Sequence, residues 1–323
     1  MSAPARFDCL CAGIIVADQV CEPIPHFPAP GTLVLTPRMT FTIGGCAANV
    51  ACDLARLGLS VGLHGCVGDD LFGRALRDQL TASGVDCRGL VAVPEQPTAG
   101  TFVINVQGED RRFIHCLGAN AVFDGTQITD ADLQSTRVLA VGGYCLLGAL
   151  TPERVIALFQ RARRAGVMTL LDVVLGDRTD YWEWVAAVMP WTDVFLPNNL
   201  EASRITGLDH PREQARKLRE AGCRNAIITS GGDGVLLDGE EGVWQADVYR
   251  VPTVDATGTG DAFLAGYVYG LKQGADVPLR LKYGAALGAS CVRAIGATTG
   301  VFNAAELEEY VRREPLRVER LGS

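Results

Sequence analysis

The chain has 323 residues, of which 48% are hydrophobic and 20% charged, and its formal net charge at pH 7 is −8. This apolar content excludes an intrinsically disordered chain, and the acidic balance argues against an overall basic surface for nucleic acid. Because domains usually contain about 100–200 residues, the length predicts one large domain or two smaller ones.

The eleven cysteines form no C-x-x-C pair and lack the spacing of a zinc site. They are expected to be reduced, mostly buried thiols, which favours a cytoplasmic protein. The apolar run Val138–Leu150 is much shorter than the roughly 20 residues that a membrane helix needs, so no membrane partner is expected.

The first hundred residues read as strands and helices separated by glycine and proline. Residues 21–40 contain five prolines, which exclude a helix there and favour edge strands and turns. Around that segment the pattern predicts a buried strand at Cys9–Val16, a helix at Ala47–Leu57 that stops at Gly58, a strand at Val61–Val67 and a helix at Leu71–Ser83 that stops at Gly84.

Residues 98–116 predict a β-hairpin, in which two apolar runs flank the polar link Gln107–Asp110. This is the only clear antiparallel pair that the sequence suggests. Together with the proline-rich segment it predicts a small β appendage, made of residues 17–42 and 98–116, on a body made of residues 1–16, 43–97 and 117–323.

The rest of the chain predicts a mostly parallel sheet with helices on both faces, because strands and helices alternate. Ligands of such sheets bind beyond the carboxyl ends of the strands. The expected strands are Val138–Val141, Thr169–Val174, Val194–Leu196, Ala226–Thr229 and Gly234–Leu237, and the expected helices are Pro152–Ala165, Asn199–Thr206, Arg212–Ala221, Asp261–Lys272, Leu279–Arg293 and Ala304–Arg313.

The segment Asp255–Phe263 places two glycines before an amphipathic helix, after an expected extended stretch at Val248–Val254. Glycines and a helix N-terminus can bind an anion through backbone N–H groups without a lysine. Asp261 then fits a base that removes a proton from an attacking hydroxyl while the amides hold a phosphoryl group. Its alternative role is an ordinary N-cap. No G-x-x-x-x-G-K-[ST] loop exists, and a G-x-G-x-x-G dinucleotide fingerprint fails at Phe263.

Three weaker motifs carry polar groups at similar positions. Gly44, Gly45 and Asn49 could hold a ligand's hydroxyls, or could be a tight turn with a buried capping asparagine. Asp18 follows the first expected strand and is either a site residue or a turn residue. Asn198 and Glu201 could lie near phosphate-bound magnesium, or could be a plain capping box.

The order of these motifs is more specific than any one of them. Strand–Asp18, Gly44-Gly45-x-x-x-Asn49, Val67-Gly68-Asp69-Asp70-x-Phe72-Gly73, Asn198-x-x-Glu201, Thr229-x-Gly231-x-x-Gly234 and Asp255-x-Thr257-Gly258-x-Gly260-Asp261 together resemble the ribokinase (PfkB) sugar-kinase family. The resemblance covers about residues 8–300. It implies an α/β ribokinase-like three-layer sandwich with a mostly parallel central sheet and a small β-sheet lid that closes over the acceptor.

The resemblance also implies a role for each motif residue. Asp261 would be the base, and the amides of Gly258, Thr259 and Gly260 would hold the transferred phosphoryl group. Asp18, Gly44, Gly45 and Asn49 would bind the acceptor. The nucleotide would be bound by Asn198, Thr229, Gly231 and Gly234, with Glu201 acting on Mg²⁺ through water and Asp255 and Thr257 lying by a monovalent-cation site for K⁺.

Three departures bear on the acceptor. Cys46 stands where ribokinases carry lysine, no acid follows Gly142-Gly143-Tyr144, and the segment from Asp172 to Arg178 lacks a D-x-N-x-R pattern. Gly-Gly-Cys-Ala-Ala-Asn-Val-Ala looks closer to the fructokinase form. Arg111 and Arg112 on the hairpin could reach an acidic acceptor or could be a solvated face.

The resulting prediction is an ATP-dependent kinase that phosphorylates a primary hydroxyl. Fructose-like sugars come first as acceptors, keto-deoxy sugar acids second and nucleosides third, and a homodimer through the lid is expected. Two other classes stay open: a non-catalytic sugar or nucleotide sensor on the same fold, which the intact Asp261 disfavours, and a dinucleotide-dependent oxidoreductase, which the failed fingerprint disfavours.

Overall fold

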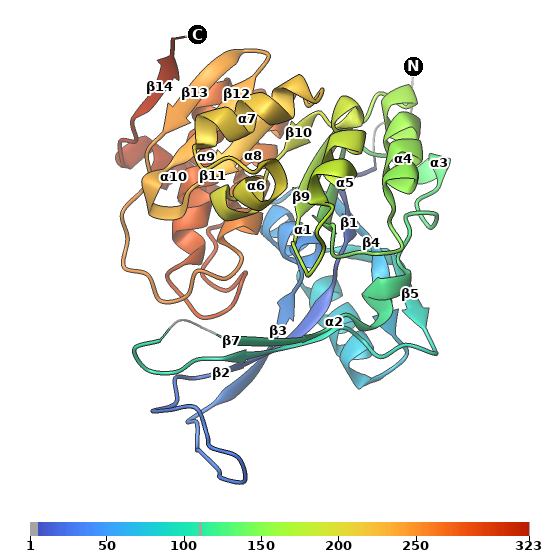
Figure 1. Cartoon of the computed structure of the whole chain (residues 1–323), viewed down its shortest axis with the longest axis vertical. Coiled ribbons are helices and arrows are strands. Elements are labelled where there is room, and N and C mark those ends of the chain that lie inside the picture. The colour runs from blue at the N-terminus through green and yellow to red at the C-terminus, as the bar shows by residue number, and fades with distance from the viewer. Residues whose placement is uncertain (1–5, 110–111, 323) are drawn as a thin grey trace.

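The computed structural model describes residues 6–109 and 112–322, and its strands form two sheets (Figure 1). The main sheet has ten strands in the order β14-β13-β12-β11-β10-β9-β8-β1-β4-β5. These are β1 (Cys9–Gly13), β4 (Val61–Gly68), β5 (Asp86–Val93), β8 (Val138–Tyr144), β9 (Met168–Val173), β10 (Val194–Phe195), β11 (Asn225–Thr229), β12 (Val235–Gly239), β13 (Gly242–Ala246) and β14 (Val318–Leu321).

Seven neighbouring strands, from β5 to β11, pair in parallel, whereas β11 to β14 pair antiparallel. The predicted mostly parallel sheet is therefore confirmed, but the expectation of only one antiparallel pair is wrong. The length of the loop between β11 and β12 could have predicted that these two strands are antiparallel. The loop is only five residues long, and a parallel crossover needs a dozen or more.

The main sheet separates two hydrophobic cores, because alternate residues of a strand point to opposite faces. Cys9 and Cys11 of β1 lie in one core, and Leu10 and Ala12 lie in the other. The first core is covered by α1 (Cys46–Arg56), α2 (Leu71–Ala82), α8 (Thr259–Lys272), α9 (Val277–Cys291) and α10 (Ala304–Arg313). The second is covered by α3 (Asp130–Gln134), α4 (Pro152–Arg164), α5 (Tyr181–Val188), α6 (Asn199–Thr206) and α7 (Pro211–Glu220), with short 3-10 turns at Gly118–Val122 and Met189–Trp191. A third 3-10 turn, Gly231–Asp233, has no buried residue.

The second sheet is a lid that projects from the body (Figure 1). Its order is β3-β2-β6-β7, from β2 (Val16–Cys21), β3 (Met39–Gly44), β6 (Gly100–Ile104) and β7 (Arg112–Cys116). The predicted hairpin is thus present as β6 and β7. Residues 22–38 contain no helix, as their prolines indicated, but the strands expected in this segment lie at its two ends, where β2 and β3 form a further antiparallel pair.

The single strand expected at Cys9–Val16 is divided between the two sheets, since β1 ends at Gly13 and β2 begins at Val16. The fully buried Asn120 holds the junction: Ile15 N–H donates to its Oδ1 over 3.2 Å, and its Nδ2 donates to Ile15 O over 3.0 Å. This side chain satisfies backbone groups that would otherwise be buried without partners.

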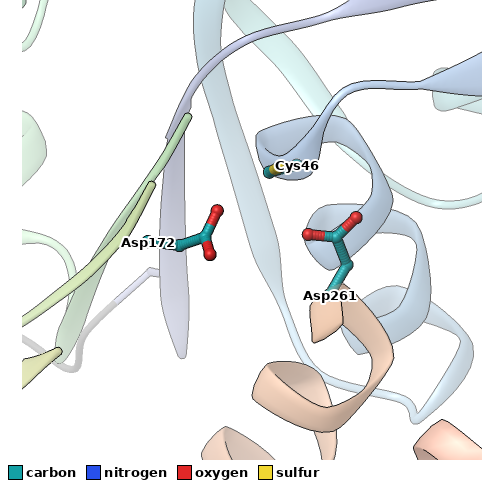
Figure 2. A group of neighbouring side chains, drawn as sticks. All are labelled: Cys46, Asp172 and Asp261. Atoms are coloured by element: carbon teal, nitrogen blue, oxygen red, sulfur yellow. The ribbon is translucent and has the colours of Figure 1, made fainter. Parts of the chain in front are cut away.

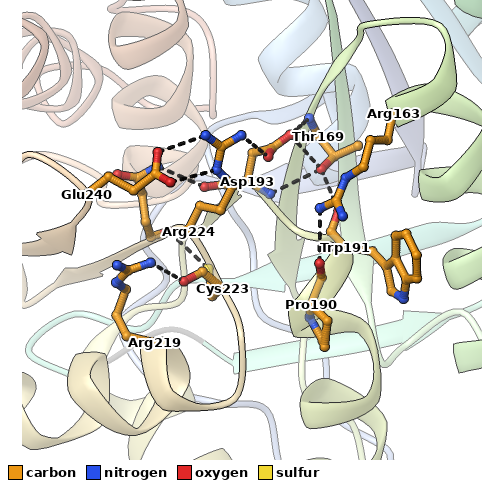
Figure 3. Close-up of polar contacts among 10 residues, drawn as sticks. Arg163, Thr169, Pro190, Trp191, Asp193, Arg219, Cys223, Arg224 and Glu240 are labelled. Carbon is orange, nitrogen blue, oxygen red and sulfur yellow. Dashed lines mark hydrogen bonds and ion pairs between the residues drawn. The ribbon is translucent and has the colours of Figure 1, made fainter.

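A polar cluster joins three strands at the amino edge of the main sheet (Figure 3). The buried Asp193, just before β10, accepts from Thr169 N–H of β9 over 2.9 Å and from Arg224 Nη1 over 3.1 Å. Arg224 also pairs with Glu240 at 2.8 Å. This network fixes the amino edge, whereas the polar motif residues gather at the opposite, carboxyl edge.

None of the described helices combines the length and the apolar character that crossing a membrane requires.

Candidate active site

Asp261 lies at the third position of α8, close to α1. The helix begins two residues earlier than expected, at Thr259, and its N-cap is Gly258, so the N-cap alternative for Asp261 is wrong. Asn49 of α1 donates from Nδ2 to Asp261 Oδ2 over 2.8 Å. Burial raises the pKa of Asp261 to about 6, although the hydrogen bonds from Asn49 and Cys46 lower it. A carboxyl group with this pKa can take up a proton near neutral pH.

Gly258 shapes the backbone in front of α8. It has φ of 79°, and a Cβ there would lie 2.6 Å from Ala297 Cβ. Only glycine adopts this left-handed conformation without strain in so tight a place. Helix N-termini carry N–H groups that can bind an anion, and Thr259 and Gly260 continue this first turn beside Asp261.

Asp255 organises the loop that leads into α8. Its Oδ1 accepts from the N–H and the hydroxyl of Thr257, at 2.9 and 2.7 Å, and its Oδ2 accepts from Gly296 N–H over 3.0 Å. The carboxylate thus connects the loop to residue 296. The stretch Val248–Val254 that precedes it, which was expected to be extended, contains neither a helix nor a β-strand.

Asp18 comes from the lid, as the third residue of β2, and does not end the first body strand. Gly44 makes room for its side chain, because a Cβ on Gly44 would lie 2.0 Å from Asp18 Oδ2. Burial raises the pKa of Asp18 to about 6; a hydrogen bond from Thr101 lowers it, and the charges of Asp255 and Asp261 raise it further. Asp18 therefore lies within electrostatic reach of Asp261.

Gly45 is the N-cap of α1, with φ of 89°, and a Cβ there would lie 2.5 Å from Ile14 O. The paired glycines thus bring the start of α1 close to the junction between the sheets. Asn49 is buried, and its Oδ1 has no hydrogen-bond partner among the described residues. Asn49 is buried, as one interpretation expected, but it does not cap α1, whose N-cap is Gly45. Its contact with a ligand's hydroxyls stays a prediction, while its amide contacts Asp261 directly.

Asn198 and Glu201 form the predicted capping box of α6, in which each side chain accepts from the other's backbone N–H at 2.9 Å. Burial raises the pKa of Glu201 to about 7, the Asn198 N–H lowers it, and the charge of Asp261 raises it. A cation would offset this negative potential. Carboxylate and water oxygens are the ligands that Mg²⁺ prefers, so the donor set fits that ion.

Asn198 also forms a parallel bridge with Thr229, and Thr229 N–H donates to Pro197 O over 3.2 Å. Thr229 ends β11, and the turn Gly231–Asp233 follows. Gly231 and Gly234 have φ of 52° and 103°. Four residues predicted for the nucleotide thus lie on adjacent segments at the carboxyl edge of the sheet.

Two further side chains face Asp261, as Figure 2 shows: Cys46 from the start of α1 and Asp172 from the end of β9. One ligand atom of each of the three residues lies within 4.8 Å of the others, a spacing at which one cation could contact all three. Asp172 went unrecognised as a site residue, although an acid at the carboxyl end of a strand was the same signal that singled out Asp18.

On the lid, Thr101 and His115 lie in register beside Asp18, and no sequence motif singled them out. Thr101 pairs in register with Asp18 and with His115, and its hydroxyl lies 3.1 Å from His115 Nδ1. Strand register creates this row, so spacing in the sequence could not reveal it. On the same hairpin, Arg112 pairs with Glu109, and Arg111 lies outside the described residues.

The fold and this arrangement of an acid beside a glycine-rich helix start define a class of phosphotransferase. The sequence profile described as pfkB family carbohydrate kinase matches residues 7–303. The chain therefore belongs to the PfkB family of carbohydrate kinases, and it is an ATP-dependent sugar kinase.

Two kinases are among the relatives of this chain, and a solved structure shares its fold. The aminoimidazole riboside kinase of Salmonella typhimurium is 31% identical over 272 residues, which cover 80% of this chain and 84% of the relative. The 5-dehydro-2-deoxygluconokinase of Geobacillus kaustophilus is 24% identical over 292 residues, covering 85% and 87%. An E. coli protein assigned as ribokinase II, solved with ATP and Mg²⁺, matches with a TM-score of 0.82 at 23% identity, covering 95% of this chain and all of that one.

Proposed function

We propose that the protein transfers the γ-phosphoryl group of ATP to a primary hydroxyl of a small sugar or sugar-like molecule. Fructose-like sugars are the first candidates and keto-deoxy sugar acids the second. The observation that carries the proposal is the half-buried Asp261, with a raised pKa, on the first turn of a helix whose N-cap is a left-handed glycine.

In the proposed step, Asp261 takes the proton of the acceptor hydroxyl. The resulting oxygen forms a bond to the γ-phosphorus as the bond to the leaving ADP oxygen breaks. The amides of Gly258, Thr259 and Gly260 hold the transferred group, while Asp18, Gly44, Gly45 and Asn49 orient the acceptor. Closure of the lid would keep water, a competing acceptor, out of the site.

The remaining motif residues are proposed to bind the nucleotide and cations. Asn198, Thr229, Gly231 and Gly234 would line the nucleotide site, and Glu201 would hold Mg²⁺ through water. A divalent cation there would neutralise charge on the transferred phosphoryl group. Asp255 and Thr257 would lie beside a K⁺ site, because the hydrogen bond from Gly296 N–H to Asp255 Oδ2 holds the oxygen atoms of their loop in place.

Release of ADP from Mg-ATP, with K⁺ present, across a panel of sugars, sugar acids and nucleosides tests the function. One strong responder identifies the acceptor. A nucleoside response would favour the nucleoside-kinase alternative, which the riboside kinase relative supports. ATP binding without any turnover would favour a sensor instead.

A homodimer through the lid is also proposed. Phe102 and Ile114 face each other across β6 and β7, and their side chains are 45% and 60% exposed. A second copy of the chain would cover them. A monomer in sedimentation equilibrium at micromolar concentration would contradict this.

The eleven free cysteines support a reducing, cytoplasmic location, which fractionation of the native cells can check.

The pH dependence of the reaction should report Asp261. A base must be deprotonated to act, so kcat/KM should fall as the pH drops through about 6. Because the Asn49 amide stabilises the ionised carboxylate, Asn49→Ala should raise the pKa of Asp261 and move this fall to higher pH. The matched control is Asn225→Ala, whose side chain donates to Asp193 O at the opposite edge. An unmoved profile in Asn49→Ala would contradict the assignment.

A further inference from the structure

The groups that face Asp261 differ in chemistry from a site built for an anionic acceptor. Asp172 points across the site toward Cys46 and Asp261 (Figure 2). Its Oδ2 atom is buried and has no hydrogen-bond partner among the described residues. A buried carboxylate oxygen is an acceptor that requires a donor, and the hydroxyl of a bound sugar is such a donor.

Cys46 is built into this arrangement by close packing. A Cβ on Gly142 of β8 would lie 2.9 Å from Cys46 Cβ and 2.9 Å from Ala47 N, so the bare backbone of Gly142 admits the start of α1. The thiol interacts with the carboxyl groups of both Asp172 and Asp261. It has one proton and can donate it to only one carboxylate at a time, so the other remains available to a ligand.

The charges around the site are negative. Burial raises the pKa of Asp18 and that of Asp172, and neighbouring carboxylates raise both further: Asp255 and Asp261 act on Asp18, and Asp261 and Glu201 act on Asp172. The main influences on the pKa of Asp18 and Asp261 are burial, hydrogen bonds and, for Asp18, neighbouring carboxylates, rather than a described lysine or arginine.

Arg178, the next cation along the chain from β9, already has partners. It hydrogen-bonds to Asp180 at 2.7 and 2.9 Å, and it lies over the ring of Trp184 with its Cζ 3.6 Å from the centroid. A carboxylate or phosphate on the acceptor would therefore lie near the carboxyl groups of Asp172 and Asp261 and would not find Arg178 free to pair with it. A neutral polyol would instead offer an O–H donor to each carboxylate.

We propose that Asp172, with Cys46 beside it, determines acceptor specificity: its carboxylate accepts a hydrogen bond from a second hydroxyl of a neutral polyhydroxylated acceptor and excludes acceptors that carry a carboxylate or phosphate. This inference rests on the proposed kinase function. It ranks neutral sugars and ribosides above the keto-deoxy sugar acids, because of the chemistry of Asp172 and Cys46.

The first test compares acceptors with the wild-type protein. D-fructose, D-ribose and aminoimidazole riboside are neutral probes, and 5-dehydro-2-deoxygluconate and ribose 1-phosphate are anionic probes. A neutral probe should have the highest kcat/KM. Preference for an anionic probe would overturn the specificity proposal and leave the kinase function intact. No ADP release with any probe would overturn both.

The second test uses Asp172→Asn, which keeps the shape of the side chain and removes its charge. KM for the best neutral acceptor should rise about 10-fold to 100-fold, with a smaller change in kcat, because the hydrogen bond orients the acceptor and Asp261 remains. The ratio of neutral to anionic kcat/KM should fall. Asp177→Asn is the matched control, since Asp177 is exposed on the following loop and should leave the ratio unchanged.

Cys46→Lys adds a cation at the same place and should raise kcat/KM for the anionic probes. Thermal unfolding and calorimetric ATP binding establish that each variant is folded. A folded Asp172→Asn variant that binds ATP and loses activity equally toward both kinds of probe would overturn the proposal.

Discussion

Asp261→Asn should bind ATP and the acceptor with nearly unchanged affinity and lose about 10²–10⁴-fold in kcat, the usual contribution of a general base. The substitution keeps the shape of the side chain and leaves an oxygen to accept from Asn49, so the packing of α1 against α8 should survive. Calorimetry with each ligand and steady-state ADP release measure the two effects separately.

The control for this variant is Asp78→Asn, which removes one negative charge from the exposed side of α2, at a residue with no proposed role in the site. Its turnover should match the wild type. Near-normal turnover in Asp261→Asn would remove the base from the mechanism, whatever the affinities show.

Gly258→Ala should lower kcat by about 10²–10³-fold, which is the range for losing a backbone donor that stabilises developing negative charge. The new Cβ would lie 2.6 Å from Ala297 Cβ and 2.7 Å from Ala297 O, at a residue with φ of 79°. The loop must therefore move, and the N–H groups of Gly258, Thr259 and Gly260 would move with it. Single-turnover phosphoryl transfer measures this loss directly.

Gly274, just beyond the other end of α8, provides a matched control. Its φ is 67°, so alanine there carries a similar backbone cost of about 1–2 kcal/mol, but no atom lies within 4 Å of the added Cβ. Gly274→Ala should lower the melting temperature and keep kcat. Equal loss of activity in the two variants would show that the Gly258 effect is one of stability alone.

Much of the body could be predicted because its elements carry local signals. Gly58 and Gly84 mark the ends of α1 and α2, and the apolar run at Val61–Val67 predicted β4. The elements that went unpredicted have mixed patterns. β5 includes Asp86 and Arg88 and alternates irregularly between buried and exposed residues, so only its pairing with β4 makes it a strand.

The residues of the candidate site also differ in whether local sequence signals predict them. Asp261, Gly258 and Asn49 belong to motifs whose spacing has a local meaning, at a helix start or one turn into a helix. Asp172 and Cys46 are 126 positions apart in the sequence and become neighbours only because β9 and α1 meet at the carboxyl edge of the sheet. The topology of the fold brings these two residues together, so the spacing of residues within one segment cannot predict their contact.

The two hydrogen bonds between Asn120 and Ile15 limit how the lid can move relative to the body. With both backbone polar groups of Ile15 bound to a buried side chain, the lid is clamped to the body at that residue. Asp18 lies three residues further along β2, roughly 10 Å from the clamp at about 3.3 Å per residue. If the lid rotates about Ile15, Asp18 moves only a short distance, whereas β7, at the far edge of the lid, moves much further. The carboxylate of Asp18, which we propose binds the acceptor, can thus keep its place while the edge of the lid at β7 moves.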